Sequence, residues 1–164
     1  MPDWSTVLLL FAAAIGCGLA GGVFFAFSGF VMQGLAMLPS GDGAKAMNAI
    51  NARAVRPPLM ILLFGTAVLC AFVVVLSFFR WNVPGMPIGA LAAVVYLGGA
   101  IGVTMLRNVP LNIALGEDAD NPDLWAQYLR EWVRWNHVRT FACAAACALF
   151  IGALWTQAQS FILF

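Results

Sequence analysis

The stretch Glu131–Leu154, EWVRWNHVRTFACAAACALFIGAL, joins ten mostly polar residues directly to an apolar segment. The polar part holds two arginines, a glutamate, an asparagine, two tryptophans and the only histidine of the chain. The apolar part has the composition of a membrane-spanning helix. The end of such a helix needs only one or two anchoring side chains. This excess of hydrogen-bonding groups is the first indication of a binding site.

The composition of the whole chain is that of an integral membrane protein. Of its 164 residues 63% are hydrophobic and 9% are charged, whereas soluble domains average about 45–50% apolar and about 25% charged residues. The net charge of +1 gives no reason to expect a nucleic-acid partner. No linker or low-complexity run divides the chain, so residues 1–164 are predicted to form a single membrane domain. The first apolar run is too long for a cleavable signal and is expected to remain as a span.

Four apolar runs predict four spans, at about residues 4–38, 59–79, 87–106 and 140–156. We therefore predict an all-α fold, an integral membrane four-helix bundle. As a helix the first run would be about 50 Å long, more than the ~30 Å hydrocarbon core requires. It must tilt, bend or project beyond the bilayer, and the glycines of GCGLAGG, residues 16–22, are the expected place for a bend.

The connections are predicted to be helical as well. Residues 44–55 read as a short amphipathic helix, with Met47, Ile50 and Ala54 along one side. The fourth helix is expected to begin near Pro122, capped by Asn121, and so to extend well beyond the membrane.

Small residues spaced four apart predict close helix packing in lipid. The pairs are Gly18 and Gly22, Gly98 and Gly102, and Ala142 and Ala146. Such faces could equally serve contacts between copies, so a homo-oligomer stays open. The four cysteines, Cys17, Cys70, Cys143 and Cys147, are expected to be packing residues.

Lysine and arginine are concentrated in the first and third connections. The first holds Lys45, Arg53 and Arg56, the third holds Arg107, Arg130, Arg134 and Arg139, and the second holds only Arg80. The positive-inside rule then places connections 39–58 and 107–139 in the cytoplasm and both termini outside, in the cell (inner) membrane. Both polar connections would lie on the same side, where they can build one shared site.

The stretch VTMLRNVPLN, residues 103–112, supplies the first candidate site residues. Pro110 interrupts the helical ladder and leaves carbonyl groups near Leu106 without donors. Asn108 and Asn112 are placed to supply amides there. The alternative is that Arg107 extends its charge to the surface and the asparagines only end a helix.

The start of the fourth helix supplies the second group. Trp125, Trp132 and Arg139 recur every seven residues, and Asn136 lies beside them, so one helix face carries two indoles, an amide and a guanidinium. The alternative is an aromatic belt with an anchoring arginine.

His137 is the only histidine, which excludes a histidine-based di-metal centre and a haem held by two histidines within one chain. No P-loop, GxGxxG or zinc spacing is present, and no metal site is predicted. Glu131 and Arg134 are expected to form a solvent-facing pair.

Four motifs together resemble one membrane family. They are VFFAFSGFVMQGL (23–35), MNAINARAV (47–55), RNVPLN (107–112) and W-x-x-W-N-H-V-R-T (132–140). The chain resembles the anthrone oxygenase-like family of small four-helix integral membrane proteins, long catalogued as a domain of unknown function. The resemblance implies oxidation of an anthrone to an anthraquinone by dioxygen, with no established cofactor. It also implies site positions, which are Asn108, Pro110, Asn112, Trp132, Asn136 and Arg139.

The catalytic expectation is stabilisation of an enolate oxygen. Arg139 with Asn136 or Asn112 would hold this oxygen, since fixed donors favour developing negative charge. His137 or Glu131 would be the base, although neither lies on the helix face that carries Arg139.

The substrate-binding expectation is an aromatic box. Trp132, together with Trp125 or Trp135, would stack on a flat polycycle. Asn108 and Asn51 would add polar contacts at the cytoplasmic mouth of the bundle.

The function predicted from the sequence is therefore a membrane-embedded oxygenase for a hydrophobic aromatic, an anthrone- or quinol-like molecule. Dioxygen is the expected co-substrate and no cofactor is predicted, while haem or a quinone stays open. The expected partners are this small molecule and the lipid bilayer. The alternative is a non-catalytic membrane protein, either a small-molecule binder or carrier or an accessory subunit.

Overall fold

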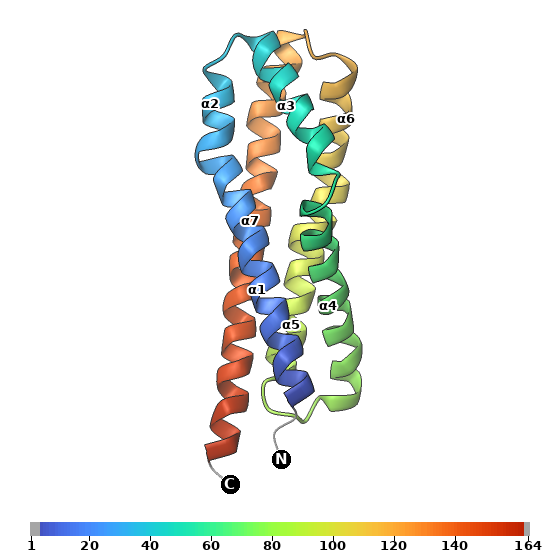
Figure 1. Ribbon diagram of the computed structural model, residues 1–164, viewed down its shortest axis with the longest axis vertical. Coiled ribbons are helices and arrows are strands. Elements are labelled where there is room, and N and C mark those ends of the chain that lie inside the picture. The colour runs from blue at the N-terminus through green and yellow to red at the C-terminus, as the bar shows by residue number, and fades with distance from the viewer. Residues whose placement is uncertain (1–3, 163–164) are drawn as a thin grey trace.

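Four long helical rods form the protein (Figure 1), and the computed structural model describes residues 4–162. Within that range it contains helices and no strand, which confirms the predicted all-α class. Four helices are long and apolar enough to cross a membrane, so the chain is a multi-pass membrane protein. They span Trp4–Ala36, Leu59–Arg80, Met86–Glu117 and Pro122–Ser160.

Two of the rods are interrupted by wider, π-helical turns. The first rod consists of α1 (Trp4–Ala26), η1 (Phe27–Val31) and α2 (Met32–Ala36). The third consists of α5 (Met86–Tyr96), η2 (Leu97–Gly102), η3 (Thr104–Asn108) and α6 (Val109–Glu117). The second and fourth rods are the continuous helices α4 (Leu59–Arg80) and α7 (Pro122–Ile162), and the short α3 (Ser40–Ala54) joins the first rod to the second.

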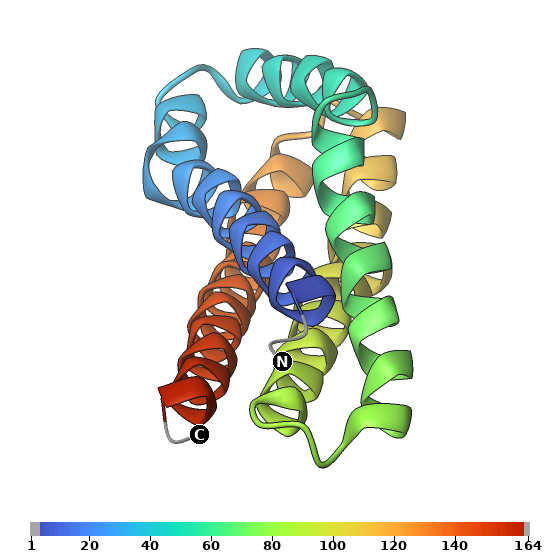
Figure 2. The same cartoon turned by 60° about the horizontal axis from the view of Figure 1, so that its bottom comes forward.

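The rods close into a ring around one apolar core. Helix α1 packs on α7 and α4, and α5 packs on the same two helices from the other side. Figures 1 and 2 show α2, α3, α6 and the start of α7 gathered at one end, with the α4–α5 turn at the other. The two polar connections therefore lie at the same end, as predicted. Which side of the membrane that end faces remains a prediction.

Helix α7 is much longer than a bilayer requires. Its 41 residues span about 60 Å at 1.5 Å per residue, against ~30 Å of hydrocarbon. Its start is the predicted one, because Oδ1 of Asn121 accepts hydrogen bonds from the backbone N–H groups of Asp123 and Leu124, both at 3.1 Å. The extra length forms a headpiece with α2, α3 and α6.

The headpiece has an apolar core of its own, separate from the core of the bundle. Its buried members are Met32, Ala44, Met47, Leu115, Trp125, Tyr128 and Trp132. The larger core lies between α1, α4, α5 and α7 and includes Cys17, Cys70 and Cys143, which are buried packing residues as expected.

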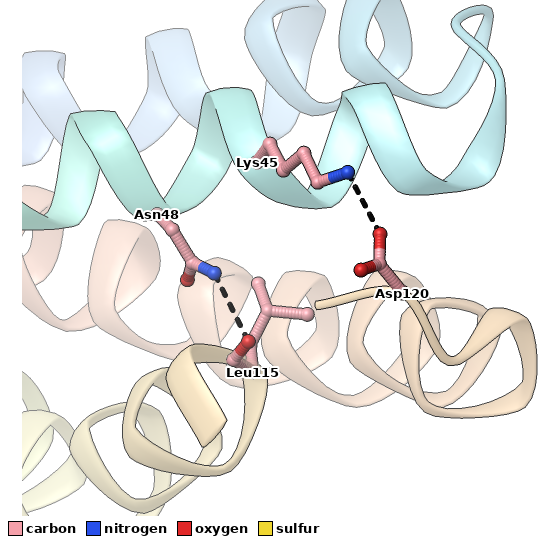
Figure 3. Close-up of polar contacts among 4 residues, drawn as sticks. All are labelled: Lys45, Asn48, Leu115 and Asp120. Atoms are coloured by element: carbon pink, nitrogen blue, oxygen red, sulfur yellow. Dashed lines mark hydrogen bonds and ion pairs between the residues drawn. The ribbon is translucent and has the colours of Figure 1, made fainter. Parts of the chain in front are cut away.

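Helix α3 is packed onto this headpiece by its apolar side and by two polar contacts. Ala44 and Met47 are fully buried, whereas Val55 lies beyond the helix end and is exposed. Lys45 Nζ lies 2.8 Å from Asp120 Oδ1, and Asn48 Nδ2 donates to the Leu115 carbonyl at 3.0 Å (Figure 3). Neither contact involves a residue after Asn48, so the last turns of α3 are held mainly by apolar packing.

The bend expected at the glycines of residues 16–22 is absent, because α1 is regular through that segment. The irregular turn is η1, which begins at Phe27. Gly16 and Gly21 instead allow close packing, because a Cβ at these positions would press on Thr66 and Cys143.

Two of the predicted small-residue pairs, Gly18 with Gly22 and Gly98 with Gly102, each include a glycine that does not face a neighbouring helix. A Cβ added at Gly22 or Gly98 would meet nothing within 4 Å. The close approaches come one residue away, where Gly21 packs on Cys143 and Gly99 packs on Ala142. Glycines follow one another in both segments, so spacing alone offers two faces and cannot choose between them.

The third rod continues through Pro110, which was predicted to interrupt its hydrogen-bond ladder. The rod continues to Glu117, and Pro110 lies in the first turn of α6, directly after η3. A proline is tolerated in a first turn because its missing N–H is not required there. Isolated π-helical turns in helices occur often at functional sites.

Candidate functional site

A cavity of about 120 Å³ lies between the bundle core and the headpiece core. Most of its wall is apolar, and Phe24, Phe27 and Trp132 contribute aromatic rings. Its polar side chains come from four different elements: Asn51 from α3, Thr104 from η3, Asn112 from α6 and Arg139 from α7. The remaining lining residues are Val23, Met47, Ile50, Ala54, Val55, Leu59, Met60, Leu63 and Val109.

Arg139 is buried, with 5% of its surface exposed, and is held on several sides. Its Nη1 donates to Thr104 Oγ1 at 3.2 Å, and its guanidinium carbon lies 4.3 Å from the ring centroid of Phe24 and 5.0 Å from that of Trp132. Both rings offer a cation–π contact. Arg139 forms no ion pair within residues 4–162. The Nε of Arg139 is buried and has no hydrogen-bond partner in this range. Arg139 is also one of the residues that line the cavity.

Asn136 lies one turn before Arg139 and fixes its position. The Oδ1 of Asn136 accepts a hydrogen bond from Arg139 Nη2 at 2.6 Å. Its Nδ2 donates to the Phe24 carbonyl at 2.6 Å and to Ser28 Oγ, so both ends of the amide are used. Asn136 is fully buried and does not line the cavity. It ties Arg139 to the first rod.

Asn112 lines the cavity and orients two aromatic residues. Its Oδ1 accepts hydrogen bonds from the Tyr128 hydroxyl and from Trp132 Nε1, both at 2.8 Å. Since the amide oxygen is occupied by two donors, a contact from Asn112 to a ligand would come from its Nδ2.

Three rings of α7 form a continuous stack. The centroids of Trp125 and Tyr128 are 5.8 Å apart, and those of Tyr128 and Trp132 are also 5.8 Å apart. Trp132 is the member that reaches the cavity, where Phe27 lies against it at 5.9 Å. Trp125 lies two rings behind the cavity wall and does not contact it.

Asn51 supplies a second unpaired donor. It is half-buried on α3, lines the cavity and lies near the Tyr128 hydroxyl, yet its Nδ2 is buried without a hydrogen-bond partner. Buried polar groups are nearly always hydrogen-bonded, and a buried group left without a hydrogen bond costs about 1–3 kcal/mol. Arg139 Nε and Asn51 Nδ2 are therefore two unsatisfied donors on residues that line one cavity.

The structure places the other sequence-predicted residues away from this cavity. Asn108 is buried, and its Nδ2 donates to the Trp132 carbonyl at 3.2 Å, which joins η3 to α7. Trp135 is half-buried on another face, where the guanidinium of Arg107 lies 4.8 Å from its ring centroid. His137 is exposed and does not line the cavity.

The predicted pair between Glu131 and Arg134 does not form. Glu131 is exposed, and its Oε1 accepts a hydrogen bond from Gln127 Nε2 at 2.9 Å. Arg134 lies over the ring of Trp135 at 5.8 Å instead. Glu131 thus contacts the residue four positions before it, and Arg134 contacts the residue that follows it, in place of the expected pair between them.

Four residues of the site were not predicted from the sequence. Tyr128 completes the stripe between Trp125 and Trp132, and helical spacing could have found it. Phe24, Phe27 and Thr104 carry no local signal of a site, because each reaches the cavity through packing between distant segments.

The sequence model for anthrone oxygenase matches residues 58–149, more than half of the chain. The chain belongs to the anthrone oxygenase family. The matched range includes Asn112, Trp132, Asn136 and Arg139, whereas the anthrone oxygenase model leaves out the cavity walls from α1 and α3. A search of curated proteins gave no match, and neither did a search of solved structures.

Proposed function

We propose that this member of the anthrone oxygenase family oxidises a hydrophobic anthrone- or quinol-like molecule with dioxygen, in the cavity beneath α3. The observation that carries the proposal is the pair of unsatisfied donors, Arg139 Nε and Asn51 Nδ2, on the wall of one largely apolar cavity. Such a wall suits a flat aromatic molecule that presents one oxygen acceptor. The family match supports an oxygenase and leaves the substrate open.

The reaction proceeds through an enolate. An anthrone loses a proton from its methylene carbon, and the negative charge moves to the carbonyl oxygen. The carbanionic carbon then bonds to dioxygen, and the resulting hydroperoxide loses water. One oxygen atom remains as the new carbonyl and the other leaves as water. Donors already fixed around the enolate oxygen lower the barrier because they need no reorganisation.

The cavity is somewhat smaller than one that encloses a single aromatic ring, so it would hold only part of such a substrate. An apolar cavity of about 150 Å³ in another protein binds benzene, and this cavity measures about 120 Å³. The rest of the substrate would extend toward its mouth. Phe27 and Trp132 offer ring faces against which a polycycle can stack.

The proton must leave by another route than a side-chain base on the cavity wall. Among the described lining residues none is a carboxylate or a histidine. We assign the proton to water or hydroxide at the mouth, and not to His137 or Glu131, which are exposed elsewhere. The same observation favours a second candidate function, a non-catalytic binder or carrier of aromatic molecules.

No cofactor enters this scheme. Within residues 4–162 no group of three or more His, Cys, Asp or Glu side chains could hold a metal. Absorption spectroscopy and native mass spectrometry of the purified protein test the scheme directly. A bound haem, flavin or quinone that is reduced by the substrate would overturn it.

Oxygen uptake with an anthrone, in lipid discs, tests the activity. Wild type should consume one dioxygen per anthrone and form the anthraquinone. Arg139→Gln should lose most of this rate, and Arg134→Gln, an exposed arginine of the same helix, should keep it. A wild-type rate equal to that of empty discs would rule out the oxygenase. If wild type then still binds an anthraquinone and Arg139→Gln does not, the carrier function holds.

A further inference from the structure

An outer groove adjoins the cavity. It is lined by Phe27, Ala49, Ile50, Arg53, Ala54 and Leu59. Four of these residues, Phe27, Ile50, Ala54 and Leu59, also line the cavity, so the two spaces share a wall. The groove runs along the last turns of α3, residues 49–54, beyond the polar contacts of Lys45 and Asn48. A ligand that fills the cavity and extends past the four shared residues would reach this groove.

Each of the two spaces has one positively charged lining residue and no described negative one. Arg53 is the charged residue that lines the groove, and Arg139 is the one that lines the cavity. Neither set of described lining residues contains an aspartate or a glutamate. The four residues that line both spaces are apolar. Such a field attracts an anion and repels a cation.

We propose that the substrate of this site is an aromatic acid, with a carboxylate at the end opposite to its reacting oxygen. The reacting oxygen lies at Arg139 and Asn51, the rings fill the apolar part, and the carboxylate binds Arg53 in the groove. A guanidinium suits this role because its fork of N–H donors matches the two oxygens of a carboxylate. The inference rests on the proposed function for the direction in which the substrate lies.

The test measures binding and not turnover. Anthraquinone-2-carboxylate and the neutral anthraquinone-2-carboxamide are titrated into the protein in phosphatidylcholine discs, with empty discs subtracted. Wild type should bind the carboxylate more tightly. Arg53→Gln should weaken carboxylate binding about two- to fivefold, the size expected for a solvent-exposed ion pair, and should leave the carboxamide unchanged. Arg56→Gln is the matched control, an exposed arginine that lines neither space.

Three results in the phosphatidylcholine discs would overturn the proposal. They are equal binding of both probes by wild type, equal weakening of both by Arg53→Gln, and an equal effect of Arg56→Gln. Discs with anionic phosphatidylglycerol test a lipid headgroup as the occupant of the groove. Because an anionic surface repels the carboxylate in any case, Arg53→Gln in the same discs gives the baseline. If wild type and Arg53→Gln bind the carboxylate equally there, the groove binds lipid and the proposal is overturned. Neither probe is oxidised, so a missing oxygenase activity would leave these binding results intact.

Discussion

Arg139 Nη2 lies 2.6 Å from Oδ1 of Asn136, so the buried guanidinium is held by a neutral amide and not by a carboxylate. A carboxylate there would neutralise the charge. The amide fixes the geometry and leaves the positive charge available to a ligand. A buried charge without a counter-ion is costly and is retained mainly where it serves a function.

Asn136→Asp tests this relationship. The aspartate keeps an acceptor for Arg139 but pairs with its charge, so the enolate loses its electrostatic partner. Because the aspartate also loses the donor to the Phe24 carbonyl, the melting temperature is measured beside the activity. We expect kcat/KM for an anthrone to fall about 100-fold, which is the effect of removing one hydrogen-bond donor from an oxyanion hole. His137→Asp adds the same charge on the exposed face of the same helix and should retain activity. Wild-type activity of Asn136→Asp would show that the charge of Arg139 plays no part.

Asn51→Leu should separate function from stability. It removes an unpaired buried donor from the cavity, so the protein should be equally or more stable to heat. Affinity for an anthraquinone should fall about two- to tenfold, the value of one hydrogen bond. Asn48→Leu is the control on the same helix. It loses the bond to the Leu115 carbonyl and should lower the melting temperature without changing affinity. A large loss of stability in Asn51→Leu would show that Asn51 Nδ2 does have a hydrogen-bond partner in the folded protein.

Gly99→Ala and Gly98→Ala should have opposite effects on stability. A Cβ at Gly99 would overlap Ala142, so this variant should cost about 1–3 kcal/mol. Gly98 faces open space, and alanine there should be neutral or should stabilise by up to about 1 kcal/mol. Thermal unfolding in one detergent compares them. Greater damage from Gly98→Ala would indicate that the exposed face packs against a second copy.

The ion pair between Lys45 and Asp120 predicts a pH dependence. The hydrogen bond that Lys45 donates to Asp120, together with the negative charge of Asp120, raises the pKa of Lys45 above its usual value. The pair therefore stabilises the fold fully below the unfolded-state pKa, about 10.4, and this stabilisation is lost as pH rises through the higher folded-state pKa. Because both side chains are largely exposed, the effect is small. Melting temperatures of wild type and Lys45→Gln should converge between pH 9 and pH 12, and a constant difference would contradict the pair.

The orientation of the protein can be tested by labelling single cysteines in intact cells. The charge distribution predicts that Glu117→Cys, in the polar end, is cytoplasmic and that Trp81→Cys, after α4, is outside. A membrane-impermeant maleimide should label Trp81→Cys in intact cells and Glu117→Cys only after lysis. Three of the native cysteines are buried and one is half-buried, so wild type gives the background. The reverse pattern would place the polar end outside.

The fold was largely predictable because it depends on hydropathy, which is local. The stripe of Trp125, Trp132, Asn136 and Arg139 was also readable, and all four are buried. Their separate roles could not be predicted, because helical spacing shows which residues share a helix face and does not show which residue each of them contacts. Asn136 bonds to Phe24, 112 residues away, and no local pattern announces such a contact.

The third rod shows the same limit. Asn108 and Asn112 lie one turn apart, and sequence treats them alike. In the structure Asn108 joins two helices while Asn112 lines the cavity. The irregular turns η2 and η3 rotate this rod, and their position depends on what packs against it. The outward-facing glycines Gly22 and Gly98 were misassigned for the same reason.

No Asp, Glu, Lys or Arg follows Arg139 in the sequence, so the cavity lies where the apolar half of α7 begins. If the apolar half of α7 spans the bilayer, as its length and hydropathy indicate, the cavity lies near the membrane interface, where aromatic side chains with polar edges are enriched. Substrate that reaches the site from within the membrane searches a surface and not a volume. The concentration that governs occupancy is then the mole fraction of substrate in the lipid, and adding bilayer at a fixed total amount of substrate would inhibit by dilution.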